Sequence, residues 1–476
     1  MLFNSIEFLL FLPIVFLLYW FVFKSRKQQN FLIVVASYVF YGWWDYRFLI
    51  LIAFTTLYSY LSGIAIDKVA STPKKQAIAL SSIIINLLIL GAFKYYNFFV
   101  ENIDALFKQL FNYELGWITL DIILPVGISF YTFQALSYTI DVYHKQIRPT
   151  HDLIEFGAYI SFFPQLVAGP IERATNLLPQ FQKTRFFQYD SAADGLRQML
   201  WGFLKKLVVA DNCAAIVNQH WGNYSSMSGL SILLLGLLFT FQIYCDFSGY
   251  SDIAIGCARL FGFNLMRNFH FPYFSRNIPD FWRRWHISLT SWFRDYIYFP
   301  LGGSRCKKWK SIRNIYIVWV ISGLWHGANW TFVCWGLYHA TFLAFYRFFG
   351  LKTKDNDMGL LPSTKDLFRI LATFFFVVIG WIIFRAESIP QACDIFSSML
   401  NNPTRNVAEI PDMKCLVFAL VLFFVEWLQK DKQHALQFPK NRFFNYRVVR
   451  WGVYYSILFI IMKFTGASQS FIYFQF

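Results

Sequence analysis

The stretch that decides the fold is "ISGLWHGANWTFVCWGLYH", residues 321–339. It is apolar and aromatic over almost its whole length, yet His326 stands within it. A polar ring in lipid is costly, so an intramembrane histidine is a functional candidate, with a hydrogen-bonded structural residue as the alternative. Gly323, Gly327 and Ala328 are small enough to let another helix or a ligand approach the histidine. Burial favours neutral imidazole, which is the form that a general base requires.

Composition extends this picture to the whole chain. Of the 476 residues, 57% are hydrophobic, 21% aromatic and only 15% charged, whereas soluble domains carry about 25% charged residues. Because a membrane span needs about 20 mostly apolar residues, we predict an all-α, polytopic integral membrane protein with about 11–13 transmembrane or re-entrant helices. The apolar runs lie at 6–23, 31–43, 47–66, 77–93, 118–140, 153–169, 194–210, 230–250, 313–349 (two spans), 367–385, 412–428 and 448–464. Several runs are short, which suggests a cavity, since irregular backbone at membrane depth must line one or pack on protein.

The basic residues predict the orientation of the chain. Lys24, Arg26 and Lys27 follow the first apolar run, and the loop 430–450 is also basic. The positive-inside rule places both in the cytoplasm, and therefore puts the N-terminus and the C-terminus outside. Basic cytoplasmic loops also account for the net charge of +16, so we expect no nucleic-acid partner. The first run lacks the pattern of a cleavable signal peptide, and the seven scattered cysteines indicate neither a disulfide framework nor a metal site.

The longest polar stretch, 267–313, is strongly basic and holds a second histidine. Within it, "DFWRRWHISLTSWFRDY" (280–296) places Trp285, Leu289, Trp292 and Tyr296 at helical spacing. The pattern predicts one helix at the membrane surface with its aromatic residues among the lipid headgroups. This interpretation does not account for His286, which follows Trp282 by one turn on the aromatic side.

Three other segments leave alternatives open. Asp246 and Asp252 in "CDFSGYSDIAIG" (245–256) would form either a proton or ion pathway or, as we favour, polar links between helices. "FFPQLVAGPIER" (162–173) predicts a span that breaks near the membrane surface. The terminal "FIYFQF" is aromatic but too short to span, so it would fold into an outward-facing groove or serve as an interfacial anchor. The sequence has no G-x-S-x-G elbow, P-loop or H-E-x-x-H motif.

Taken in order, several segments resemble the membrane-bound O-acyltransferase superfamily, and in particular its bacterial branch that O-acetylates alginate and peptidoglycan. The similar segments are "YISFFPQLVAGPIERATNLLPQF" (159–181), "FQIYCDFSGYSDIAIGCARLFGF" (241–263), "NFHFPYFSRNIPDFWRRWHISLTSWFRDYIYFPLGGSR" (268–305), "SGLWHGANWTFVCWGLYH" (322–339) and "FIYFQF" (471–476). The resemblance implies a ring of helices around a thin central partition with a cavity on each side. It also implies one membrane-embedded domain over 1–476, a catalytic core at 120–340 and an outward-facing tail at 465–476.

The resemblance also assigns roles to residues. His326 matches the family's catalytic histidine, and His286 matches its second characteristic histidine. Phe471, Tyr473 and Phe476 match a terminal F-x-Y-x-x-F pattern, whose tyrosine is proposed to carry the acyl group transiently. On the cytoplasmic side, Arg283 and Arg284 suit the phosphates of a coenzyme A thioester, and we place Trp282 and Trp285 beside them in the same site.

These expectations define a function. The chain would take acetyl groups from cytoplasmic acetyl-CoA, a substrate rather than a tightly bound cofactor, and present them outside a bacterial inner membrane through Tyr473. A periplasmic SGNH-type transferase would then place them on an envelope or extracellular polysaccharide such as an alginate-like polymer or peptidoglycan. Two alternatives remain: acylation of a lipid or a secreted protein, and a transporter that moves an acetylated carrier without chemistry.

Overall fold

The computed structural model describes residues 1–167, 169–351, 359–404, 414–438, 444 and 446–472. Within these ranges the regular secondary structure is helical and no strand occurs, which confirms the predicted all-α class. The chain forms two compact units, each described below by itself. By length and composition, four of the described helical segments could cross a membrane: Tyr46–Lys68, Thr72–Phe111, Gly229–Leu260 and Thr364–Arg385.

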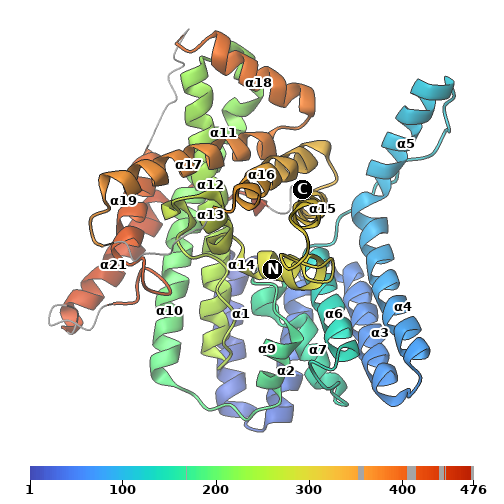
Figure 1. Ribbon diagram of the computed structural model, residues 1–476. Coiled ribbons are helices and arrows are strands. Elements are labelled where there is room, and N and C mark those ends of the chain that lie inside the picture. The colour runs from blue at the N-terminus through green and yellow to red at the C-terminus, as the bar shows by residue number, and fades with distance from the viewer. Residues whose placement is uncertain (168, 352–358, 405–413, 439–443, 445, 473–476) are drawn as a thin grey trace. The chain divides into compact units, whose positions relative to one another are not determined.

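Unit 1 comprises Met1–Ala192 and Ala258–Leu265. Its elements are α1 Ile6–Leu17, η1 Leu18–Val22, α2 Arg26–Gly42, η2 Tyr46–Phe48, α3 Leu49–Lys68, α4 Thr72–Leu90, η3 Gly91–Tyr95, α5 Tyr96–Phe111, α6 Ile128–Tyr143, α7 Leu153–Ser161, α8 Phe163–Leu166 and α9 Ala174–Phe181. Helices α3 and α4 lie side by side, and α6 packs against both (Figure 1). The segment 258–265 belongs here because Tyr19 and Trp20 donate hydrogen bonds to the carbonyls of Phe261 and Leu260, at 3.1 and 2.9 Å.

Two predicted features of unit 1 can be compared with the structure. The break predicted within 162–173 is present, since α7 ends at Ser161 and α8 spans only four residues. The apolar run 118–140 is helical only from Ile128, where α6 begins. Gly127 precedes it with a φ of 74°, and a Cβ at that position would overlap the carbonyl oxygen of Leu166. A residue with positive φ cannot continue a right-handed helix, so it delays the start of α6.

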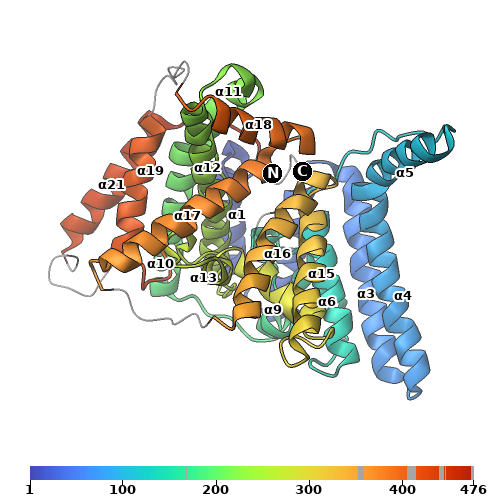
Figure 2. The ribbon, with the colours of Figure 1, turned by 45° about the horizontal axis from the view of Figure 1, so that its top comes forward.

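Unit 2 comprises Ala193–Cys257 and Met266–Phe476 and contains most of the predicted functional residues. Its elements are α10 Tyr189–Phe203, which begins in unit 1, η4 Leu204–Ala210, α11 Asp211–His220, η5 Trp221–Ser226, α12 Gly229–Leu260, η6 Pro272–Phe274, α13 Ile278–Arg284, α14 Ile287–Phe293, η7 Arg294–Tyr298, α15 Lys308–His326, α16 Trp330–Phe349, α17 Thr364–Arg385, α18 Ile389–Asn401, α19 Lys414–Leu428 and α21 Arg447–Phe464. The views of Figures 1 and 2 both show α15 beside α16, as the two arms of a hairpin. The run 313–349 is thus divided between two helices, as predicted, while neither helix is among the four segments long and apolar enough to cross a membrane.

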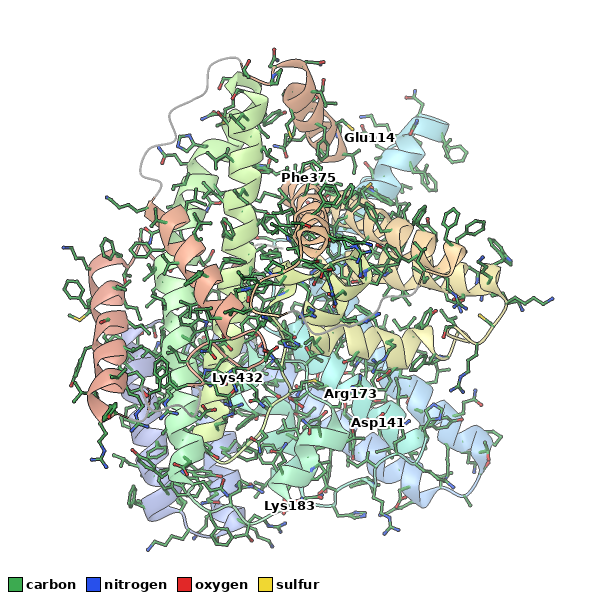
Figure 3. All side chains as sticks on the ribbon, turned by 60° about the vertical axis from the view of Figure 1, so that its left-hand side comes forward. Glu114, Asp141, Arg173, Lys183, Phe375 and Lys432 are labelled. Carbon is green, nitrogen blue, oxygen red and sulfur yellow. The ribbon has the colours of Figure 1, made fainter. Side chains whose placement is uncertain are left out.

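Apolar side chains cover the outer face of α17. Leu367, Phe368, Leu371 and Phe375 are all exposed and follow helical spacing along one side of the helix. Phe375 is labelled on this helix in Figure 3. A continuous exposed apolar stripe on a helix of this length is suited to lipid contact, which agrees with the multi-pass membrane character of the chain.

Glycines bring η4 and the end of α10 against α12 in unit 2. A Cβ at Gly202 would lie 2.6 Å from the carbonyl oxygen of Gly249, and a Cβ at Gly249 would lie 2.8 Å from that of Gly202. At Gly256 a Cβ would overlap the carbonyl oxygen of Gly195. Small residues at such positions let two helix backbones touch, as is common in membrane proteins. The lysines of η4 therefore lie directly against the acidic residues of α12.

Candidate functional site: two histidines in an aromatic cluster

A tight helical hairpin positions His326. It is the last residue of α15, and the turn to α16 ends at Asn329, whose side chain accepts a hydrogen bond from the Thr331 N–H at 3.0 Å. Gly323 lies so close to α16 that a Cβ there would overlap the carbonyl oxygen of Phe332. Gly323 therefore makes room for helix α16. The sequence had left open whether a helix or a ligand approaches the histidine.

Aromatic rings surround His326, which is 4% exposed. Its ring centroid lies 4.9 Å from that of Trp325, 4.9 Å from that of Trp335 and 5.3 Å from that of Phe384. All three pairs are close to perpendicular, at 78°, 85° and 79°, and edge-to-face is a favoured arrangement of aromatic rings. The contacts shield the imidazole from bulk water and fix the plane in which its nitrogens lie.

His286 stands at a break between two short helices. The prediction of one continuous helix over 280–296 is wrong at its centre, because α13 ends at Arg284 and His286 has a φ of 44° and a ψ of 53°. The main chain of 268–270 pairs with the broken segment: Ile287 N–H donates to the Asn268 carbonyl and His270 N–H to the Arg284 carbonyl, both at 2.9 Å. These hydrogen bonds satisfy backbone N–H and C=O groups that would otherwise lack a partner at the break in the helix.

The predicted surface location of this segment is also wrong. The aromatic and aliphatic side chains expected among lipid headgroups, Trp285, Leu289 and Trp292, are only 1%, 3% and 5% exposed. They lie inside unit 2, together with His286, which is 1% exposed. A non-glycine residue in the left-handed region is uncommon and is often held in place at functional sites. The break turns the His286 ring inward instead of along a surface helix.

Asn268 sets the tautomer of His286. The Asn268 Oδ1 accepts a hydrogen bond from the Ser288 hydroxyl at 2.9 Å, while its Nδ2 donates to the Ser251 hydroxyl at 3.2 Å. The same Oδ1 lies 3.1 Å from His286 Nδ1. Because Oδ1 can only accept, Nδ1 must carry the hydrogen, and in the neutral ring the lone pair is then on Nε2. His286 is thereby prepared to accept a proton or a hydrogen bond at Nε2.

A line of rings joins the two histidines. The His286 ring lies 5.8 Å from that of Trp325, which neighbours His326 along the chain and contacts its ring. On its other side the His286 ring is 4.6 Å from that of Phe247 on α12. The structure therefore brings both predicted histidines into one aromatic cluster of unit 2, from α12, α15 and the α13–α14 break.

A third buried histidine, His339, was not singled out in the sequence. It is 1% exposed, and its ring lies 4.9 Å from that of Trp282 and 5.2 Å from that of Trp335, the same ring that contacts His326. A Cβ at Gly380 would be 2.8 Å from its Nε2, so α17 approaches it closely. One signal in the sequence could have identified His339 as a candidate. It is a second histidine in the apolar segment 321–339, thirteen residues after His326.

The start of the tail motif is buried in unit 2. Phe471 and Ile472 are 0% and 1% exposed, and the Phe471 ring lies 4.5 Å from that of Tyr250 and 5.9 Å from that of Phe247. The tail thus reaches an aromatic ring that itself contacts His286. Tyr473 and Phe476, the other two positions of the motif, lie outside the described residues.

The acidic residues of α12 link helices, which is the interpretation that the sequence favoured. Lys205 Nζ lies 3.0 Å from Asp252 and 2.8 Å from Glu426 of α19. Lys206 Nζ lies 2.8 Å from Asp246 and 2.8 Å from Asp211. These lysines did not stand out within the apolar run 194–210, because their partners lie on other helices.

The four residues predicted to bind the donor are separated by the fold. Arg283 is exposed, and Arg284 is bound to Asp280 with Nε 2.9 Å from Oδ1. Trp282 and Trp285 are instead buried in the aromatic cluster. That they bind the donor stays a prediction.

A groove of about 420 Å³ between α16 and α17 offers another place for an anionic ligand. Its walls include Phe342 and Phe376, and its polar residues include Arg276 and Arg369. Both guanidinium groups lie near Asp366, at 3.6 and 3.8 Å. Neither arginine stood out in the sequence, because they are far apart along the chain and only the fold brings them to one groove.

The long apolar helices of this all-α chain are those of a multi-pass membrane protein, and its two buried histidines are enclosed by aromatic rings. A match to the membrane-bound O-acyltransferase family covers residues 144–386 and includes both histidines. The chain belongs to this family and is an O-acyltransferase.

Several relatives have names that describe the modification of envelope polymers. The chain is 39% identical to a probable alginate O-acetylase AlgI of Pseudomonas aeruginosa, over 86% of this chain and 77% of that protein. It is 34% identical to a peptidoglycan O-acetyltransferase of Helicobacter pylori, over 84% of this chain and 80% of that protein. It is 32% identical to a teichoic acid D-alanyltransferase of Bacillus subtilis, over 55% of this chain and 69% of that protein.

Proposed function

We propose that this O-acyltransferase moves acetyl groups from cytoplasmic acetyl-CoA to the outer face of a bacterial inner membrane, where an envelope or extracellular polysaccharide receives them. Relatives that are named as acetylating alginate and peptidoglycan support the polymer acceptor. Positive-inside reasoning supports an N-terminus and a C-terminus outside. The observation that carries the proposal is the burial of Phe471 and Ile472, with the Phe471 ring beside that of Phe247, which contacts His286.

The chemistry follows from ordinary acyl transfer. The Tyr473 hydroxyl attacks the thioester carbonyl, a C–O bond forms, the C–S bond breaks and coenzyme A leaves as a thiol. A tyrosine of pKa about 10 is mostly protonated at neutral pH, so a base is needed, and we assign that role to His326. The proton passes from the phenol through the imidazole to the leaving sulfur. The two arginines of the α16–α17 groove suit the phosphates of the donor.

A second protein completes the proposed route. An SGNH-type transferase outside the membrane would accept the acetyl group from Tyr473 on its serine and pass it to a hydroxyl of the polysaccharide. The tyrosyl ester suits such a relay, because a phenolate is a better leaving group than an alkoxide. The tail would then carry the acetyl group only between two transfers.

The test is acetylation of the tail itself. Membranes that contain this chain without the downstream transferase are incubated with labelled acetyl-CoA, and the C-terminal peptide is examined by mass spectrometry. We expect an acetyl group on Tyr473, no label on the tail of Tyr473→Phe, and loss of polymer acetylation in that variant. Tyr455→Phe, at an exposed tyrosine of α21, is the matched control and should behave as wild type.

Other outcomes would point to the alternatives. An active Tyr473→Phe variant would reduce the tail to a docking element and would imply direct transfer to a partner's hydroxyl. Membranes that export acetyl groups without consuming acetyl-CoA would favour a transporter. Labelled lipid or secreted protein in place of polysaccharide would favour an acyltransferase for those acceptors.

A further inference from the structure

Two adjacent lysines of η4 are almost completely buried. Lys205 is 3% exposed and Lys206 is 1% exposed, and each lies between two carboxylates. A buried charge is costly unless it is paired and its hydrogen bonds are satisfied. The π-helical turn Leu204–Ala210 in which they lie is itself a rare element that is frequent at functional sites.

The polar cluster around Lys205 consists of side chains from helices. Lys205 pairs with Asp252 and Glu426, the Tyr244 hydroxyl donates to Glu426 at 2.8 Å, and the Gln198 amide donates to Asp252 at 2.8 Å. All of these residues belong to α10, η4, α12 and α19. These ion pairs and hydrogen bonds link helices, and none of them involves the described C-terminal residues 465–472.

The cluster around Lys206 is completed by the C-terminal segment. An ammonium group has three N–H donors. Those of Lys206 have three acceptors within reach: Asp211 at 2.8 Å, Asp246 at 2.8 Å and the main-chain carbonyl of Gln469 at 3.1 Å. The second oxygen of Asp246 accepts the main-chain N–H of Ile472, also at 2.8 Å. One donor and one acceptor of a buried ion cluster thus depend on the tail.

We propose that Lys206, Asp211 and Asp246 form a binding site that holds the C-terminal segment of this chain by its main chain. Lys206 and Asp246 contact the segment directly, and Asp211 positions the ammonium. The ring of Phe471, between the two bonded residues, fills the space beside Tyr250 and Phe247. Main-chain bonds fix where the segment lies, while the aromatic ring fixes its register along the chain.

Undocking would leave a donor of a buried ammonium and an acceptor of a buried carboxylate without their protein partners, which typically costs more than an ordinary lost hydrogen bond. The buried ions therefore stabilise the docked tail. The catalytic value of this docking rests on the proposed role of Tyr473, but the docking itself does not.

The experiment is hydrogen exchange on the full-length protein in detergent, followed over residues 466–471. Ile472→Pro removes the N–H that Asp246 accepts and, at the end of the chain, leaves the helical core intact. Ile472→Val, which keeps the N–H and most of the apolar side chain, is the matched control. We expect protection in wild type and in Ile472→Val, and a loss of roughly tenfold or more in Ile472→Pro.

A second pair of variants tests the ion cluster from the protein side. Lys206→Met should remove protection of 466–471. Tyr244→Phe should retain this protection. Tyr244 lies two residues before Asp246, and the variant removes the hydrogen bond that its hydroxyl donates to the buried Glu426 of the neighbouring cluster. If Lys206→Met does not fold, the tail variants still decide the question. The proposal would be overturned if residues 466–471 exchanged without protection in wild type, or if Ile472→Pro left their protection unchanged. A protected tail that is never acetylated would instead refute the proposed function alone.

Discussion

At the scale of single residues, His326 is enclosed so closely that its role can be tested by a change of similar size. We expect His326→Gln to fold and insert, because glutamine fills similar space, but to lower acetyl transfer by about 10²–10⁴-fold, the usual contribution of a general base. The measurement is consumption of labelled acetyl-CoA by membranes that contain equal amounts of protein. His144→Gln, at an exposed histidine, is the matched control.

The result separates the two interpretations of a buried histidine. Near-normal transfer by His326→Gln would leave His326 as a packing residue within its three aromatic neighbours. The base would then have to be sought at His286, whose Nε2 carries the lone pair because Asn268 fixes the hydrogen on Nδ1. We expect His286→Ala to impair transfer in either case.

Residue-scale chemistry was only partly visible in the sequence. His326 stood out because one polar ring in an apolar span is conspicuous whatever the fold. The left-handed conformation of His286 did not, because helical periodicity reports spacing and cannot reveal a positive φ. Asn268 lies 18 residues before His286, and only the tertiary pairing of 268–270 with the break makes it a partner. The arginines of the α16–α17 groove did not stand out for a similar reason, since charge in the sequence does not say which groove it faces.

At the scale of elements, the α15–α16 hairpin depends on glycine. A Cβ at Gly336 would overlap the carbonyl oxygen of Trp319, so Gly336→Ala must push the two helices apart. We expect a loss of about 1–3 kcal/mol, as for other overpacked cores. Gly452→Ala is the matched control, because nothing lies within 4 Å of a Cβ there and alanine favours a helix by roughly 0.5–1 kcal/mol.

Thermal unfolding in detergent checks the comparison. Gly336→Ala should lower the midpoint of the transition, and Gly452→Ala should leave it unchanged or raise it. Equal midpoints for the two variants would mean that the helices relax at no cost, and that close approach of α16 does not fix the position of His326.

Elements were predicted best where composition alone determines them. The hairpin within 313–349 and the break at 162–173 follow from apolar length and from proline and glycine, which act locally. The apolar run 194–210 was recognised, but not its π-helical turn or its ion clusters. The two lysines of "LKKL" become intelligible only beside carboxylates of α11, α12 and α19, and no local pattern records such partners.

At the scale of the whole molecule, the proposed route requires donor and tail to lie on opposite sides of the membrane. Lys308, at the start of α15, and Ser468, before the buried part of the tail, are both exposed and suit cysteine labelling. The exposed native Cys393 is first replaced by serine to remove background reaction. With an impermeant reagent, we expect residue 308 to react only from the cytoplasm and residue 468 only from outside, because basic loops stay inside. If both react from one side, an acetyl group need not cross the membrane to reach the tail, and the two-cavity arrangement is wrong.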